Sequence, residues 1–186
     1  MSWIDLDRNL AFVHVGKTSG AIWTHWLWNE CHLLRCAAHD SAEYIRDRFP
    51  QYWNPAFKVA FVRNPWAWWV SAYHWFDFKH QYPTFDAMML DHERWFMRHF
   101  PFEGQWRTIC DGQQNLLVDF VGRTERLQED FDLICDRINY PRFTLPKRET
   151  RRIYSQFYTP TTRELVANIS RIDIEKFGFS YQDGVP

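Results

Sequence analysis

The sequence predicts an α/β protein built on a parallel β-sheet that helices cover on both faces. Two observations lead to this prediction. Short continuous apolar runs are typical of strands buried on both faces, and longer helix-like stretches alternate with them along the chain. This alternation favours βαβ units, whose strands are parallel. A length of 186 residues suits one domain with a substantial core, so residues 1–186 are interpreted as a single domain.

The elements follow from local patterns. Strands are expected at residues 10–15, 57–62 and 116–121. Ser41 can cap a helix that Pro50 stops, Asn64 and Pro65 form a strong helix start, and Thr159 opens the last helix, which ends at Gly178. Helices are therefore expected at residues 21–34, 42–49, 65–78, 84–100, 124–138 and 160–177.

Composition narrows the function classes. A net charge of −1 and a pI near 6.7 argue against a general nucleic-acid binder, which usually carries a basic surplus. The four cysteines show no CxxC pair or zinc spacing and are expected to be reduced thiols. Without a signal peptide or an apolar run of membrane-spanning length, the protein is expected to be cytoplasmic with no membrane span. Aromatic residues make up 19%; most are expected in the core, and some suit a sugar ring.

The first candidate site is the loop Gly16-Lys17-Thr18-Ser19-Gly20, which follows the first apolar run and leads into a helix. Glycines let backbone amides approach a ligand, a helix N-terminus favours an anion, and lysine and hydroxyls complete an anion-binding loop. It is not a Walker A motif, which would need glycine where Ala11 stands. Taken alone, such a loop is more often a turn with a solvated lysine.

The second candidate site follows the second apolar run, where Arg63 precedes the helix start at Asn64. Ser71 comes close to two helical turns after Asn64, so both lie on one helix face. Arg63 and Ser71 can therefore converge on one phosphate, although each is more often structural when taken alone. Since α/β proteins bind ligands at the carboxyl ends of their strands, the two sites together predict a ligand with two separated phosphate-type groups.

Three runs in this order, FVHVGKTSG, FKVAFVRNPWAWWVSAYHWF and VDFVGRTERLQEDFDLI, resemble the sulfotransferases that use 3′-phosphoadenosine 5′-phosphosulfate (PAPS). They are most similar to the carbohydrate-type enzymes of the Golgi and their small bacterial relatives, over roughly residues 10–182. The resemblance implies a P-loop-like parallel sheet in one sulfotransferase-like domain. It also implies transfer of a sulfuryl group from PAPS to an acceptor hydroxyl of a carbohydrate or another small molecule, with PAP as the second product.

The resemblance also implies roles for individual residues. Lys17 would hold the bridging oxygen of PAPS as the leaving group gains charge, and Arg63 and Ser71 would bind the 3′-phosphate. The 5′-phosphosulfate would be lined by Gly16, Lys17, Thr18, Ser19, Gly20 and Ala21. No metal is expected, because a transferring sulfuryl group carries less negative charge than a phosphoryl group, and lysine and backbone amides can offset it.

The acceptor hydroxyl needs a base, and His39 is the candidate, because it lies between the two motifs at the spacing seen in the carbohydrate-type relatives. Its alternative interpretation is a helix-flanking histidine beside Asp40. His14 lies inside the first apolar run and is expected to be structural. His74 and His80 are the alternatives as substrate contacts.

The chain departs from the family pattern at a few positions. Gly16 replaces a proline, Ala21-Ile22 replace a hydroxyl pair, and Trp68 replaces an arginine. Two other functions therefore stay open: a P-loop nucleotide kinase, which the missing Walker A spacing disfavours, and a non-catalytic nucleotide-binding protein with this fold.

Overall fold

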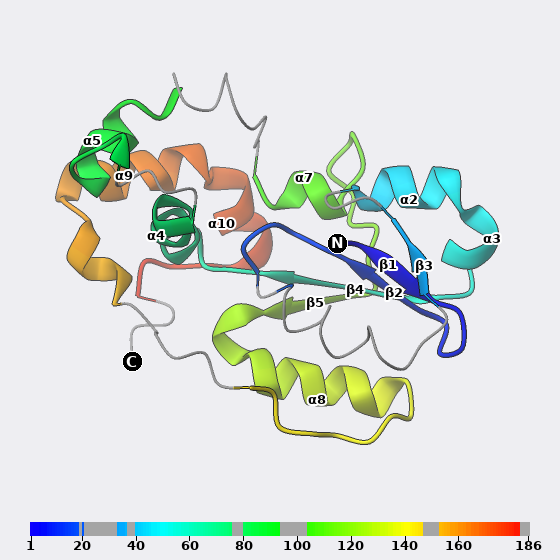
Figure 1. Cartoon of the computed structure of the whole chain (residues 1–186). Helices are drawn as coiled ribbons and strands as arrows, with labels where there is room; N and C mark the ends of the chain where they lie inside the picture. The colour runs from blue at the N-terminus through cyan, green and yellow to red at the C-terminus, as the bar shows by residue number, and fades with distance from the viewer. Residues whose placement is uncertain are drawn as a thin grey trace. The chain divides into compact units, whose positions relative to one another are not determined.

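A computed structural model describes residues 1–18, 20, 33–36, 40–75, 80–93, 104–146 and 153–182 (Figure 1). The chain divides into two compact units, each built from two segments. Unit 1 comprises Met1–Val62 and Gln105–Arg148, and unit 2 comprises Arg63–Gly104 and Glu149–Pro186. The interpretation of residues 1–186 as one sulfotransferase-like domain stays a prediction.

Unit 1 is built on a mixed five-stranded sheet with the strand order β3-β1-β2-β4-β5. The neighbours β2, β4 and β5 are parallel, whereas β1 is antiparallel to both β2 and β3. The prediction of an entirely parallel sheet is therefore wrong at the β1–β3 edge. The strands are β1 (Trp3–Asp5), β2 (Leu10–Val13), β3 (Leu33–Arg35), β4 (Phe57–Val62) and β5 (Phe120–Arg123).

The turn between β1 and β2 explains the antiparallel pair. The buried carboxylate of Asp5 accepts hydrogen bonds from the backbone N–H groups of Asp7 and Arg8, at 3.0 and 3.1 Å, and pairs with the Arg8 guanidinium at 2.8 Å. Asn9 adopts a positive φ of 50°, which asparagine tolerates better than most residues. An antiparallel pair needs only such a short connection, so β1 pairs with β2 although the sequence predicts no strand before residue 10.

The other strand predictions have mixed outcomes. The prediction at 57–62 is confirmed, and that at 10–15 is two residues too long. The prediction at 116–121 is displaced, because Leu116 forms an isolated bridge with Cys110 before β5 begins at Phe120. The helix predicted at 21–34 is wrong at its end, where residues 33 and 34 belong to β3, and residues 21–32 lie outside the described part of the chain.

Helices lie on both sides of the unit 1 sheet (Figure 1). On one side α8 (Leu127–Arg137) buries Phe131 and Ile134 against Phe12 and Phe61 of the strands. On the other side lie α2 (Ala42–Arg48) and α7 (Trp106–Ile109), while α3 (Pro50–Trp53) follows α2 directly. Since the residues of β2 and the last four of β4 are all buried, these strands are covered on both faces, as predicted.

Helix boundaries in unit 1 agree with the capping residues. Ser41 Oγ accepts from the Tyr44 N–H at 3.2 Å and begins α2, which confirms the helix predicted at 42–49 to within one residue. Pro50 ends α2 and also begins α3. The helix predicted at 124–138 is present as α8, preceded by the 3₁₀ turn η2 (Thr124–Arg126).

Gly122 in β5 faces the ring of Phe61, so that a Cβ there would lie 2.5 Å from Phe61 Cε1. Replacing Gly122 by alanine is therefore expected to lower the free energy of unfolding by about 1–3 kcal/mol through overpacking, measured by urea denaturation. Gly112→Ala is the control, because a Cβ there meets no atom within 4 Å. Equal effects of both substitutions would contradict the close packing of β4 and β5.

Unit 2 is helical. Its other elements pack around the helix α4 (Pro65–Trp75), most of whose residues are buried. The helix predicted at 84–100 begins at its cap Thr84 as α5 (Phe85–Leu90) and is interrupted at Asp91. Residues 92 and 93 are helical again, and residues 94–100 lie outside the described part. The helix predicted at 160–177 is two helices, α9 (Pro160–Ile169) and α10 (Arg171–Phe177), preceded by the 3₁₀ turn η3 (Tyr154–Phe157).

The start of α9 and the end of α10 agree with the predicted helix ends, but the break between the two helices was not predicted. Thr159 forms a capping box with Thr162, and Gly178 ends α10 with a positive φ of 62°. Ser170 separates α9 from α10, and its side chain accepts from Trp69 Nε1 at 3.4 Å. Among the described residues, no helix has both the length and the apolar character needed to cross a membrane.

Candidate functional site

The loop after β2 closes on itself through Thr18. This side chain is fully buried, and its Oγ1 donates to the carbonyl of Val15 at 2.6 Å. The hydroxyl that was predicted to line the 5′-phosphosulfate therefore stabilises the turn.

Lys17 has an unusual backbone conformation in this loop. Its φ is 67°, in the left-handed region that costs a residue with a Cβ about 1–2 kcal/mol. The side chain is half-buried, as is Gly16 before it. Non-glycine residues in this region often occur at ligand-binding loops, where the surrounding structure maintains the strain.

Gly20 packs directly against the imidazole of His14. A Cβ at Gly20 would lie 2.0 Å from His14 Nε2, so no larger residue fits without movement. The His14 N–H donates to Ser2 Oγ at 2.9 Å, its Nδ1 lies 2.7 Å from the Met1 nitrogen, and its ring stacks on Phe12. His14 thus packs against Gly20 at the end of the Lys17 loop. This is a structural role, as the sequence predicts for His14.

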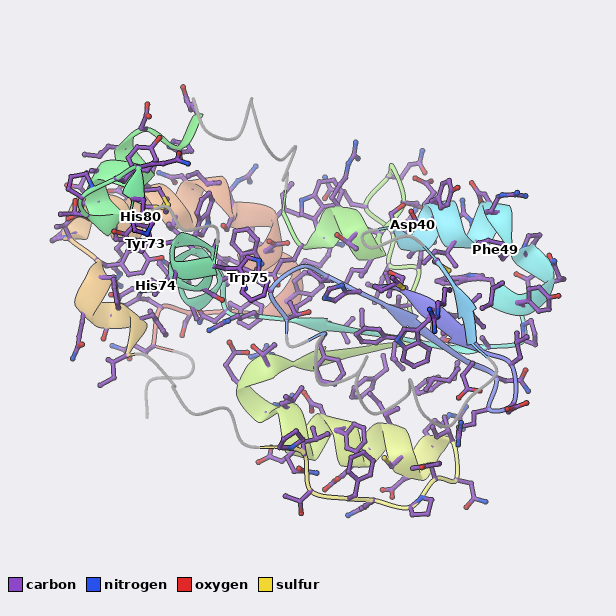
Figure 2. All side chains as sticks on the ribbon, in the orientation of Figure 1. Asp40, Phe49, Tyr73, His74, Trp75 and His80 are labelled. Atoms are coloured by element: carbon purple, nitrogen blue, oxygen red, sulfur yellow. The ribbon has the colours of Figure 1, made fainter. Side chains whose placement is uncertain are left out.

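Three predicted site residues, Ser19, Ala21 and the candidate base His39, lie outside the described residues. The residue after His39 is described: Asp40 lies just before α2 (Figure 2), and its carbonyl accepts from Ser2 Oγ at 3.3 Å. Ser2 therefore contacts both His14, which directly follows β2, and the segment that follows His39.

Asn64 caps α4 as the sequence predicted. Its fully buried side chain accepts from the Trp66 N–H at 3.1 Å and donates from Nδ2 to the carbonyl of Ser180 at 2.7 Å. The second bond connects the start of α4 to the C-terminal segment of unit 2. Arg63, half-buried, comes directly after β4 and just before this cap.

Ser71 occupies a distinctive position on α4. From Pro65 to Tyr73 every residue of the helix is buried except Ser71, which is half-buried. Trp68, where the family pattern has an arginine, is in the core with its ring edge-to-face against Trp69 at 5.5 Å. Over these two turns, a ligand can therefore reach the α4 side chains best at Ser71.

The alternative histidines of unit 2 have different surroundings. His74 lies between α4 and η3 (Figure 2), where its ring meets Tyr73 and Phe157 edge-to-face at 5.1 and 5.3 Å. This arrangement is a packing contact of the core. His80 is exposed. It lies in the turn before α5 (Figure 2).

The two halves of the predicted donor site belong to different units. The Lys17 loop is part of unit 1, whereas Arg63 and Ser71 are part of unit 2, and the structure describes each half by itself. Within unit 1, β2 and β4 are adjacent and parallel, with Val13 opposite Ala60, so that both strands end at the same edge of the sheet.

The described cysteines are buried. Burial raises the pKa of both the Cys36 and the Cys135 thiols to about 11, so they stay protonated, and Cys110 is buried as well. Cys31 lies outside the described residues. Within the described part of the chain, no group of three or more His, Cys, Asp or Glu side chains could hold a metal ion.

Unit 2 contains a cavity of about 510 Å³ that the sequence interpretation missed. Trp66, Tyr158 and Tyr181 form its aromatic part, and α9 contributes Arg163 and Glu164. Further lining residues on α9 are Pro160 and Ala167, which share a face with Arg163 and Glu164 at helical spacing. That spacing was visible in the sequence, but the aromatic partners come from segments far apart in the chain.

Comparison of the chain with protein-family models, with curated proteins and with solved structures gave no match.

Proposed function

We propose that the chain is a PAPS-dependent O-sulfotransferase that transfers a sulfuryl group to a hydroxyl of a carbohydrate or another small molecule. The main support is one arrangement: two adjacent parallel strands are each followed directly by an element suited to an anion. After β2 comes the glycine-flanked loop with Lys17, and after β4 come Arg63 and the capped start of α4. The three ordered motifs that resemble the family supply the identity of the donor.

In the proposed reaction the acceptor oxygen attacks sulfur in line with the bond to the bridging phosphate oxygen. The new S–O bond forms as the old one breaks, and PAP leaves with the electron pair of that bond. The acceptor proton passes to His39 as the base. The Lys17 ammonium and the backbone amides of its loop offset the charge that develops on the leaving oxygen.

Arg63 and Ser71 account for the preference for a 3′-phosphate. A guanidinium can donate two parallel hydrogen bonds to a phosphate, and the Ser71 hydroxyl can add a third from the accessible position of α4. A nucleotide without the 3′-phosphate would leave these donors without their anionic partner.

Calorimetry with PAP, ADP and ATP tests this proposal. We expect PAP to bind at least about tenfold more tightly than ADP, and Arg63→Ala to weaken PAP about 10- to 100-fold while changing ADP little. Arg171→Ala is the matched control, because Arg171 is an exposed arginine of the same unit that pairs with Glu175 on its own helix. Preference for ATP with Mg²⁺ would contradict the proposal in favour of a kinase. Tight PAP binding without any consumption of PAPS would favour the non-catalytic alternative.

A further inference from the structure

The aromatic cavity of unit 2 has the features of a ligand site in its own right. Its volume of about 510 Å³ is within the range of small-molecule pockets. All its lining residues belong to unit 2, and Lys17 and the loop of unit 1 take no part. Binding of a ligand in this cavity is therefore independent of sulfotransferase activity.

The rings in the aromatic part of the cavity contact one another. The ring of Tyr181 meets Trp66 at 5.5 Å and Tyr158 at 5.9 Å, edge-to-face in both cases. The Tyr158 hydroxyl donates to the carbonyl of Trp66 at 2.8 Å, and burial raises its pKa well above the usual value, so it stays a donor. Since these contacts already position the rings, binding of a flat ring ligand against them would cost the protein side chains little further conformational entropy.

Arg163 supplies a positioned cation at the cavity. Its guanidinium carbon lies 4.2 Å from the centre of the Tyr181 ring, and in the described part of the chain no carboxylate forms an ion pair with it. A guanidinium that stacks on a ring keeps its N–H groups directed outward in its own plane, where they match the two oxygens of a carboxylate or sulfate.

Glu164 further restricts which chemical groups a ligand of this cavity can carry. This exposed carboxylate lines the same cavity and only accepts hydrogen bonds, so it repels an anion and favours a hydroxyl donor. A ligand that satisfies both side chains carries an oxyanion toward Arg163 and a hydroxyl toward Glu164. We propose that the cavity binds a hydroxylated ring, aromatic or sugar, that bears a carboxylate or sulfate group.

The test uses the full chain and two pairs of probes in saturation-transfer NMR and calorimetry. The pairs are 4-hydroxybenzoate with phenol, and glucuronate with glucose, so the two arms separate an aromatic from a sugar ring. We expect at least one acid to bind, with its neutral partner at least about fivefold weaker. Arg163→Gln should remove this preference, and Arg163→Lys should restore part of it. Arg171→Gln, a matched loss of charge on α10, should leave it unchanged.

Three outcomes would overturn the proposal. In the first, neither acid binds with a Kd below about 10 mM. In the second, Arg171→Gln weakens the acid as much as Arg163→Gln does, which would mean general attraction by surface charge. In the third, saturating PAP displaces the acid, which would place the acid in the donor site instead. Thermal unfolding of each variant separates a lost ligand contact from a lost fold.

Discussion

Replacing Lys17 by alanine is expected to lower the rate of sulfuryl transfer about 100- to 1000-fold while weakening the binding of PAPS much less. The ammonium group is proposed to act on charge that develops on the bridging oxygen as the bond to sulfur breaks. Its interaction is therefore stronger in the transition state than in bound PAPS, whose bridging oxygen carries little charge. The measurement is consumption of labelled PAPS with a panel of sugars and small alcohols, or its slow hydrolysis by water. It is made at several PAPS concentrations, so that kcat and the KM for PAPS are obtained separately.

Two controls separate this effect from a damaged loop. Lys17 has a φ of 67°, and glycine adopts such a value without strain, so Lys17→Gly should be as inactive as Lys17→Ala and at least as stable. Lys58→Ala removes a lysine of β4 whose ammonium lies 3.5 Å from Asp119, and it should keep full activity. Full activity of Lys17→Gly would show that Lys17 has no catalytic role.

Replacing Gly20 by alanine is expected to destabilise the protein by about 1–3 kcal/mol and to abolish PAP binding. The new Cβ would lie 2.0 Å from His14 Nε2 and 2.3 Å from His14 Cδ2. The ring cannot easily move away, because it stacks on Phe12 and its Nδ1 contacts the Met1 nitrogen. Either the imidazole or the end of the Lys17 loop must therefore shift. Urea denaturation measures the first effect, and calorimetry measures the second.

A double-mutant cycle with His14→Ala tests the cause. If the clash with the imidazole is responsible, the double variant should be more stable than the sum of the single effects predicts, by about 0.5–3 kcal/mol. Strictly additive effects would show that Gly20 is needed for another reason. The cycle does not depend on any assumption about function.

Local chemistry explains most of the successful predictions. The start of α2 follows from Ser41, that of α4 from Asn64 and Pro65, and the end of α10 from Gly178. In each case the side chain or backbone conformation satisfies groups within the same helix end, so a few neighbouring residues contain the necessary information. The continuous apolar run of β4 likewise predicted a strand buried on both faces.

Contacts between distant segments explain the errors. β1 is a strand because Trp3 and Ile4 pair with β2 and with β3. β3 includes residues 33 and 34, which were predicted to end a helix. The break at Ser170 coincides with a contact to Trp69, which is far away in the sequence. No local pattern encodes these pairings, since their stability comes from burial against residues elsewhere in the chain.

The sequence by itself determined where the helix caps and the central parallel strands lie. It also determined that the Lys17 loop follows one of these strands and that Arg63 follows another. These features depend on backbone groups satisfied by near neighbours and on continuous apolar runs. Only the tertiary structure decided that Thr18 closes its own loop, that His14 leaves room for nothing larger than glycine at position 20, and that Arg163 lies over Tyr181 beside a cavity. Those features depend on the distances between side chains after packing, which residue types and spacing do not specify.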